Sequence, residues 1–222
     1  MRRRNGIPLG TVLKTLGKVY TTPKTFLHFR TPLDLAVAVI LSAQCTDKRV
    51  NIVTESILYP KYKIPQDYLN VARGELERDV HSCGTYRMKA KHIQEMCGLL
   101  IVRHSGRIPR TMEELTALPG IGRKTANVIL SAAFGINVGI AVDTHVIRVS
   151  QRLGLTTHSD PKKIELDLMP FAPKKEWRRV TTLLISLGRD VCTARNRSCI
   201  RCPFTKKCPS SLVFGKKDLA KA

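Results

Sequence analysis

The sequence predicts an all-α fold. Apolar residues recur at helical spacing in several segments, whereas no stretch of the 222 residues shows a convincing alternation of period two. Capping residues, prolines and glycines mark where these segments begin and end. Hydrophobic residues make up 43% of the chain, which is enough for one domain or two small ones, and the 5% aromatic content makes the core aliphatic.

Two apolar helices are predicted after residue 30. Thr31-Pro32 followed by Asp34 supplies a cap, a first-turn proline and a reciprocal acid for a helix over residues 33–43. Its continuous aliphatic run indicates burial on all sides. The next helix, over residues 48–58, carries an apolar face and ends at Pro60. That face consists of Val50, Val53 and Ile57.

Further helices are predicted over residues 74–80, 89–103, 161–168 and 175–187. The last of these is closed by Gly188 and carries an apolar stripe that is most simply core. The stripe consists of Trp177, Val180, Leu184 and Leu187.

A glycine hairpin follows in the segment 111–134. Thr111, with Glu114 three residues on, forms a capping-box start for a short helix over residues 112–117, which Pro119-Gly120 then stops. Gly120 and Gly122 permit backbone angles that side chains forbid, so the turn and the start of the next helix can point N–H groups at one phosphate. This arrangement would grip nucleic acid without reading its sequence. The alternative is an ordinary helical turn with glycines for packing.

An amine and a carboxylate accompany the hairpin. Lys124 lies in the first turn of the helix predicted over residues 123–134, and Asp143 follows nineteen positions later. Both can do chemistry on a sugar whose phosphate the hairpin holds, which predicts a DNA-cutting enzyme. Asp143 also precedes Thr144-His145-Val146 as a helix cap would, and capping and catalysis can coexist. His145 itself is interpreted as structural.

The charge balance predicts a polyanionic partner. Lys and Arg number 38 against 17 Asp and Glu, a formal charge of +21 with a pI near 10.1. Surfaces that are merely soluble usually mix both signs and carry a far smaller excess, so nucleic acid is favoured. No long apolar segment points to a membrane. The basic start, Met1-Arg2-Arg3-Arg4, lacks the apolar run of a secretory signal, so we expect a cytoplasmic location, nucleoid-associated in a prokaryote.

Four cysteines near the C-terminus predict a metal centre. Separated by six, two and five residues, they are Cys192, Cys199, Cys202 and Cys208. This stretch has one Cys-x-x-Cys and no His, which favours an iron–sulfur cluster with four thiolate ligands over zinc, the competing metal. Basic residues between the ligands can balance the cluster charge or contact DNA. The remaining Cys45, Cys83 and Cys97 are interpreted as buried small hydrophobes.

Taken together, these sequence motifs resemble those of the endonuclease III family of the helix-hairpin-helix superfamily. The resemblance runs from about residue 10 to 210 and includes residues 41–44, 118–127, 141–145 and 187–189 with the cysteine spacing. It implies a six-helix barrel domain over residues 24–136, with the helix-hairpin-helix at 111–134. It also implies a second domain from residues 1–23 and 137–222, whose loop 192–208 holds a [4Fe-4S] cluster. Lysine and aspartate would face each other across the interdomain groove.

The same resemblance assigns roles to single residues. Lys124 matches the Schiff-base lysine and Asp143 the essential aspartate of the family. Gln44 matches the glutamine that fills the void left by a flipped nucleotide, and backbone at Leu118, Gly120 and Gly122 would hold DNA, with Arg123 and His145 as further contacts. Where many relatives have a leucine wedge, this chain has Thr85, and Arg87 is a candidate to share that task.

The implied function is excision of oxidised pyrimidines from damaged double-stranded DNA by a monomer, with strand cleavage by β-elimination. Mismatch thymine or uracil glycosylases and adenine glycosylases are alternatives, but they typically lack a lysine at position 124. The adenine enzymes also carry an extra C-terminal domain, for which the residues after Cys208 leave no room. A noncatalytic iron–sulfur module that binds DNA and senses redox state is a remote alternative.

Overall fold

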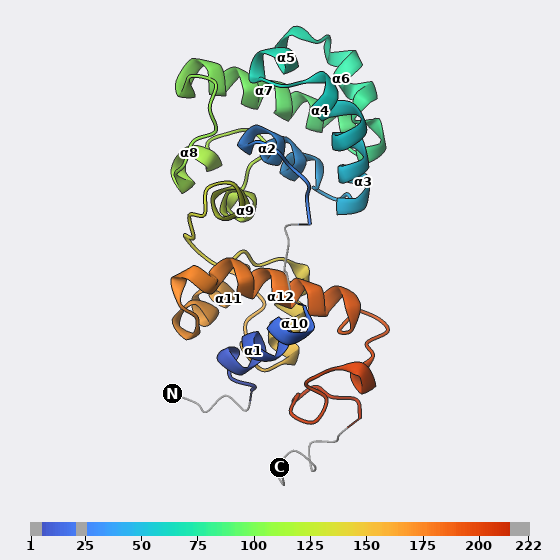
Figure 1. Ribbon diagram of the computed structural model, residues 1–222, viewed down its shortest axis with the longest axis vertical. Coiled ribbons are helices and arrows are strands. Elements are labelled where there is room, and N and C mark those ends of the chain that lie inside the picture. The colour runs from blue at the N-terminus through green and yellow to red at the C-terminus, as the bar shows by residue number, and fades with distance from the viewer. Residues whose placement is uncertain (1–5, 21–25, 214–222) are drawn as a thin grey trace. The chain divides into compact units, whose positions relative to one another are not determined.

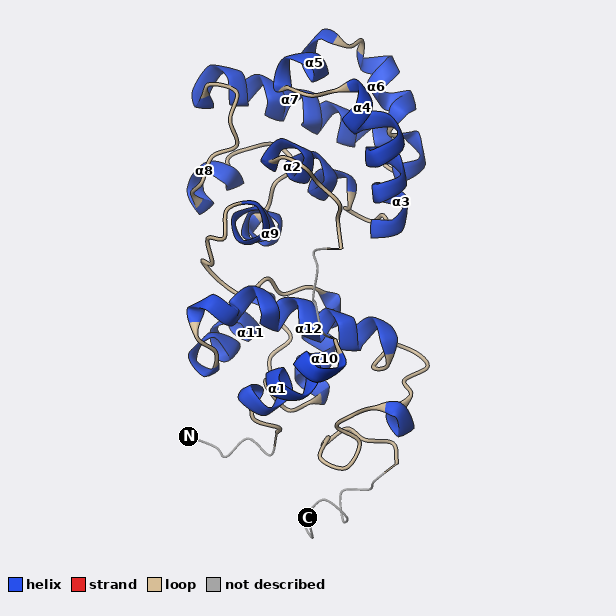
Figure 2. Cartoon of the chain, in the orientation of Figure 1, coloured by secondary structure: helices blue, strands red, loops and turns tan. Residues whose placement is uncertain are grey.

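The computed structural model describes residues 6–20 and 26–213, and their regular structure is entirely helical (Figures 1 and 2). The predicted all-α class is confirmed. The chain divides into two compact units, residues 25–138 and residues 1–24 with 139–222. The basic segment at residues 1–4 and the predicted boundary between residues 23 and 24 lie outside the described residues. Within them, no helix is both long and apolar enough to cross a membrane.

The unit of residues 25–138 is built around one buried helix. Helix α2 (Pro32–Leu41) has every residue from Leu33 to Leu41 buried and packs against α7 and α9. Thr31 and Asp34 form the predicted capping box at its start. The surrounding helices are α3 (Asp47–Val53), α4 (Tyr59–Lys61), α5 (Pro65–Asn70), α6 (Arg73–Asp79), α7 (Tyr86–His104), α8 (Met112–Thr116) and α9 (Arg123–Ala133).

Helix α3 does not end at Pro60, so that prediction was wrong. A π-helical turn, Thr54–Leu58, follows α3, and the Tyr59 amide donates to the Thr54 carbonyl five residues back. Pro60 then lies in the first turn of α4, where its missing N–H leaves no hydrogen bond unmade. The widened turn therefore lets the helical path pass through the proline.

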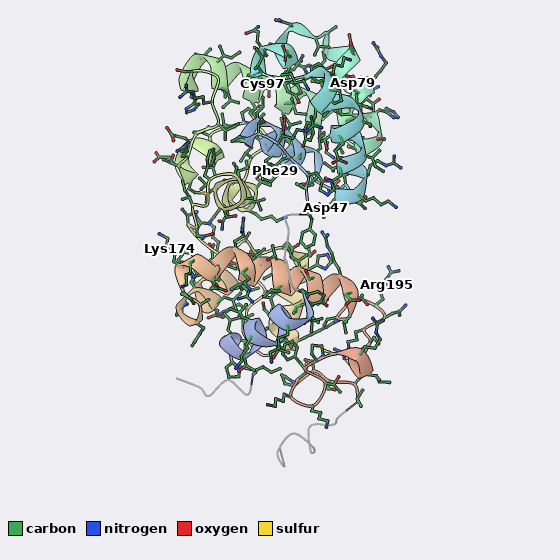
Figure 3. The ribbon with its side chains drawn as sticks, viewed as in Figure 1. Phe29, Asp47, Asp79, Cys97, Lys174 and Arg195 are labelled. Carbon is green, nitrogen blue, oxygen red and sulfur yellow. The ribbon has the colours of Figure 1, made fainter. Side chains whose placement is uncertain are left out.

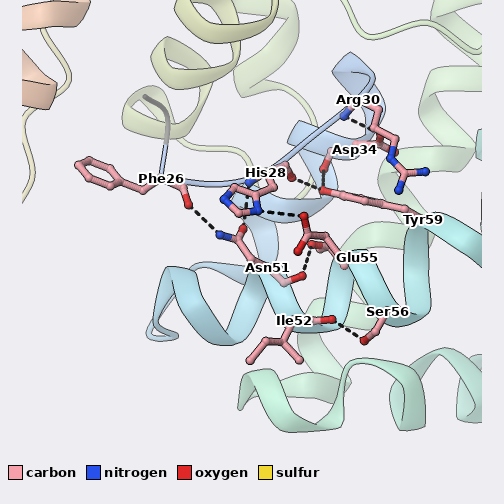
Figure 4. Close-up of polar contacts among 10 residues, drawn as sticks. Phe26, His28, Arg30, Asp34, Asn51, Ile52, Glu55, Ser56 and Tyr59 are labelled. Atoms are coloured by element: carbon pink, nitrogen blue, oxygen red, sulfur yellow. Dashed lines mark hydrogen bonds and ion pairs between the residues drawn. The ribbon is translucent and has the colours of Figure 1, made fainter. Parts of the chain in front are cut away.

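Polar contacts tie the chain before α2 to α3 and α4 (Figure 4). The Asn51 side chain accepts from the His28 amide and donates to the Phe26 carbonyl, both at 2.9 Å. Tyr59 Oη donates to the His28 carbonyl at 2.7 Å and to the Asp34 carbonyl at 3.3 Å. These bonds hold residues 26–34 in place before the buried helix begins.

Two helices were not predicted from the sequence, α5 and α1 (Leu9–Val19). Helix α5 has a readable signal, since Pro65 occupies its first turn and the Asp67 side chain accepts from the amides of Lys63 and Ile64. Helix α7 also begins three residues before the predicted position 89, at Tyr86.

The other unit contains α1, α10 (Thr144–Arg152), α11 (Pro161–Leu168) and α12 (Trp177–Asp190), with α12 packed against α1 and α10. Val180, Leu184 and Leu187 of α12 are fully buried, as the predicted stripe requires, whereas Trp177 is only partly buried.

Gly188 does not close α12, which continues to Asp190. A Cβ atom at position 188 would lie 3.1 Å from the Cβ and Nδ1 of His145. This glycine therefore serves close packing of α12 on α10 and does not serve as a helix stop.

Candidate active site

The glycine hairpin joins α8 to α9, and its apolar side chains are buried in the core. Leu118 and Ile121 are 3% and 4% exposed, and the Ile121 amide donates to the Leu118 carbonyl at 3.2 Å. Gly120 has φ +78°, and a Cβ there would approach His92 to 3.1 Å and Ile40 to 3.2 Å. Glycine is thus required at position 120 by both backbone angle and space. Leu118 can contact a ligand only through its backbone.

Gly122 differs from Gly120. Its φ of −92° is open to any residue, so the expectation that its backbone angle demands glycine was wrong. Nothing lies within 4 Å of the position a Cβ would take. Gly122 is the N-cap of α9, and among the described residues no side chain caps it. The start of α9 therefore offers N–H groups and open space to an incoming anion.

Lys124 is the second residue of α9 and is exposed. Helix α9 buries Ala126, Ile129 and Leu130 on its opposite face, which directs the lysine away from the core. No hydrogen bond or ion pair to another described residue holds its ammonium group. The start of α9 thus presents Lys124 to solvent, directly after the exposed Arg123. Among the described residues, the first turn of α9 contains no acidic side chain.

Asp143 is the N-cap of α10. Its Oδ1 accepts from the Val146 amide at 2.8 Å, so the predicted capping geometry is present. The cap fixes the carboxylate orientation and leaves Oδ2 as the oxygen able to face a ligand. Asp143 belongs to the unit of residues 139–222, and Lys124 to the unit of residues 25–138.

His145 lies in the first turn of α10, next to two arginine side chains. Arg148 Nη2 lies 3.0 Å from His145 Nδ1 and donates to the Gly188 carbonyl at 2.9 Å. Burial lowers the pKa of His145, and the guanidinium groups of Arg148 and Arg189 act in the same direction against Asp143. These surroundings favour the neutral ring, which fits the structural interpretation of His145.

Gln44 and Thr85 are both exposed on turns with left-handed backbone. Their φ angles are +53° and +41°, and Ser105 is the other non-glycine residue with positive φ in the described chain. Such conformations cost about 1–2 kcal/mol each. Arg87, also exposed, lies over the Tyr86 ring at 5.4 Å, and the Tyr86 and His81 rings meet at a tilt of 48° with centroids 4.5 Å apart. Backbone strain thus coincides with the two positions predicted to enter the duplex.

Lys89 is a candidate that the sequence prediction missed. It is 3% exposed, and its Nζ donates to the carbonyls of Leu41 and Cys83 at 2.8 and 2.7 Å. The signal was present, because Lys89 shares a helical stripe with the buried Ile93 and Met96. A lysine on an apolar stripe is unusual enough to mark.

The four C-terminal cysteines line one cavity, together with Arg152 and Arg197. Burial raises the pKa of the Cys202 and Cys208 thiols, and the neighbouring cysteines add to the effect. Arg152 Nη1 lies 3.4 Å from Cys192 Sγ and donates to the Thr193 carbonyl at 2.7 Å. Across the described ranges, no three His, Cys, Asp or Glu side chains form a group suited to a single metal ion.

The other cysteines lie in the unit of residues 25–138. Cys83 and Cys97 are buried as predicted, whereas Cys45 is partly exposed. Figure 3 shows Cys97 among packed side chains and Lys174 and Arg195 projecting from the other unit. The basic side chains Arg195, Lys206 and Lys207 are exposed on the cysteine loop.

Comparison with known proteins places these features in context. The model of the HhH-GPD superfamily of base excision DNA repair proteins matches residues 37–174. An endonuclease III from Synechocystis sp. is 46% identical over 200 residues, 90% of this chain and 91% of that relative. A non-covalent endonuclease III–DNA complex has a TM-score of 0.87 and 44% identity, covering 91% of this chain and 94% of that one. A trapped covalent endonuclease III–DNA intermediate has a TM-score of 0.86 with the same identity and coverage.

Proposed function

Because the chain belongs to the endonuclease III family of the HhH-GPD superfamily, we propose that it is a base-excision-repair DNA glycosylase and abasic-site lyase acting on damaged duplex DNA. The observation that carries the mechanism is the exposed Lys124 at the uncapped start of α9, directly behind the glycine hairpin. An amine placed there lies beside the sugar of any phosphate that the hairpin binds.

The hairpin acts first by holding the backbone. Amides at the start of α9 have no side-chain cap from the described residues and meet open space at Gly122. A phosphate oxygen satisfies such donors and lies at the positive end of the helix dipole. The formal charge of +21 also attracts the DNA backbone over a longer range, and this attraction weakens as the salt concentration rises. Neither contribution depends on base sequence.

Lys124 then acts as the nucleophile. Its neutral amine attacks C1′ of the flipped nucleotide, and the base leaves with the electron pair of the glycosidic bond and takes up a proton. Opening of the sugar ring gives an imine between Nζ and C1′. Loss of a proton from C2′ breaks the C3′–O3′ bond, which cleaves the strand, and water releases the lysine.

Asp143 supports this chemistry through charge and proton transfer. Positive charge develops at the sugar as the base leaves, and a carboxylate oriented by its Val146 bond stabilises that charge. The carboxylate also accepts and returns protons during imine formation. Capping is thus the means by which α10 orients this group.

Oxidised pyrimidines are the substrates we assign. A base leaves the stack at a cost of a few kcal/mol, which is least for lesions that already stack or pair poorly. Gln44, Thr85 and Arg87 would contact the opened duplex, and Arg123 and His145 its backbone. Mismatched thymine or uracil is the runner-up. A panel of duplexes with oxidised, deaminated and alkylated bases decides between them, and preferential excision of mismatched thymine or uracil would overturn the assignment.

Cys192, Cys199, Cys202 and Cys208 would hold a [4Fe-4S] cluster. Four cysteines around one cavity fit a group that takes four thiolates. When bound, such a cluster cross-links the loop and can exchange one electron. Arg152 would then hydrogen-bond a ligating sulfur and so offset its negative charge. Zinc stays the alternative metal.

Purified protein is expected to be yellow-brown and to contain about four irons per chain. Cys199→Ser should lose the colour and most of the iron, because a missing thiolate leaves the cluster incompletely ligated. Cys45→Ser, in the other unit, is the control and should keep both. Colourless wild-type protein with one zinc per chain would contradict the cluster assignment.

Gly122→Asp should separate folding from DNA binding. Aspartate is a preferred N-cap, so it should stabilise the fold by about 0.5 kcal/mol. The same carboxylate takes the amides that a phosphate would use and repels it, so binding should fall by about tenfold or more. Urea melts and binding to damaged and undamaged duplexes measure the two effects.

Gly120→Asp is the matched comparison. Its positive φ and its contacts with His92 and Ile40 should make this substitution destabilising by about 2 kcal/mol. Unchanged affinity of Gly122→Asp for both duplexes would refute the phosphate role of the hairpin.

The remaining assignments follow from the substrate. The enzyme would act in the compartment that holds the DNA, the cytoplasm in a prokaryote, and as a monomer. Strand cleavage of abasic duplex DNA by the purified chain tests the function as a whole. Binding without cleavage would favour the noncatalytic redox-sensing alternative.

A further inference from the structure

Lys89 is a buried ammonium group held by backbone carbonyls. It lies in the first turn of α7, and its two bonds reach Leu41 and Cys83. No carboxylate of the described residues forms an ion pair with it. Burial lowers its pKa, and the Cys45 and Cys83 thiols oppose that effect. A buried charge kept at such a cost calls for a role beyond packing.

The two carbonyls both end short helical segments. Leu41 is the last residue of α2, and Cys83 ends the 3₁₀ turn His81–Cys83. Carbonyls at helix ends lack an internal partner and favour a cation nearby. Lys89 therefore closes two helix ends with one group and ties them together.

Each tied end leads directly into an exposed loop. Gln44 follows Leu41 by three residues, and Gly84 and Thr85 follow Cys83 at once, all three with positive φ. Burial and the neighbouring Cys45 thiol raise the pKa of Cys83 to about 11, so the two thiols lie close to each other. Two strained, exposed loops are thus both anchored at the buried Lys89.

We propose that Lys89 is a positioning residue that fixes the spacing between the loops of Gln44 and Thr85, so that both enter the duplex at one lesion. The proposal rests on the DNA contacts assigned above to those loops. Loops that are already held in place lose less conformational freedom on insertion, which offsets part of the cost of unstacking.

The test compares an intact lesion with a site that needs no opening. Lys89→Met keeps the length of the side chain and removes its donors, and it should lower kcat/KM on a duplex base lesion by about 10²-fold. Cleavage of an abasic site in single-stranded DNA should stay near the wild-type rate. The fluorescence rise of 2-aminopurine placed beside the lesion, which reports unstacking, should be lost. Circular dichroism sets an assay temperature at which each variant is folded.

Two further variants sharpen the comparison. Lys89→Arg keeps donors for the carbonyls and should recover much of the fluorescence signal. Lys91→Met alters an exposed lysine on the same helix, paired with Glu95 at 3.7 Å, and should match wild type. Equal losses on duplex and single-stranded substrates, or an unchanged 2-aminopurine signal, would overturn the proposal.

A readout without DNA separates this proposal from the proposed function. Dibromobimane fluoresces when it bridges two nearby thiols, so wild type should give a Cys45–Cys83 bridge, identified by peptide mass. Lys89→Met should form it more slowly because the loops move apart. Equal bridging rates in wild type and Lys89→Met would contradict the positioning role of Lys89 even if the enzyme is active. If wild-type protein is inactive but shows the expected difference in bridging, only the proposed function would be contradicted.

Discussion

Lys124→Gln is expected to abolish strand cleavage of abasic duplex DNA, with a loss on the order of 10³-fold or more. The amide cannot form the imine, so no route to β-elimination remains. Binding should change little, because the hairpin and its amides are intact. The measurement is single-turnover cleavage with enzyme in excess, alongside affinity for the same duplex.

The chain offers a matched control for this substitution. Lys162 is likewise the second residue of its helix, α11, and is exposed. Lys162→Gln removes the same charge at an equivalent helix start and should leave cleavage near wild type. A comparable loss in both variants would mean that charge, not the Lys124 amine, supports activity.

Asp143→Asn should reduce base excision by about 10²-fold or more while affinity for DNA is retained or increased. Asparagine caps a helix as well as aspartate, so α10 should remain formed and the free energy of unfolding should stay within about 0.5 kcal/mol. The loss therefore reports the missing negative charge. Excision and binding are measured on the same lesion duplex.

Asp160→Asn is the matched control for Asp143. Asp160 caps α11 through Oδ1 and the Lys163 amide at 3.0 Å, the same geometry as at α10. It should keep full activity. If Asp143→Asn loses affinity together with activity, the carboxylate at 143 would instead be a structural cap alone.

Local signals predicted those parts of the fold that local interactions determine. Helix α2 could be predicted because its start is marked by the capping box of Thr31 and Asp34. The apolar run that follows is also buried in the structure. Asp143 could be placed as a cap for the same reason. The four cysteines could be grouped by their spacing, and in the structure all four line one cavity.

Features that depend on distant partners were missed. Gly188 resembles a helix stop until His145, far away in sequence, is seen to fill the space beside it. Pro60 resembles a stop until the preceding π-helical turn shifts the hydrogen-bond pattern. The apolar stripe marks Lys89 as a buried lysine, but its carbonyl partners, Leu41 and Cys83, are known only from the fold. The residue contacts with DNA stay predictions for the same reason.

Borohydride reduction in the presence of abasic or lesion-bearing DNA tests the central claim most directly. Reduction of the imine should join protein and DNA covalently, and peptide mass analysis should place the adduct on Lys124. Lys124→Gln should give no adduct, while Lys162→Gln should give as much as wild type. An adduct on another residue, or equal trapping by Lys124→Gln, would contradict the account.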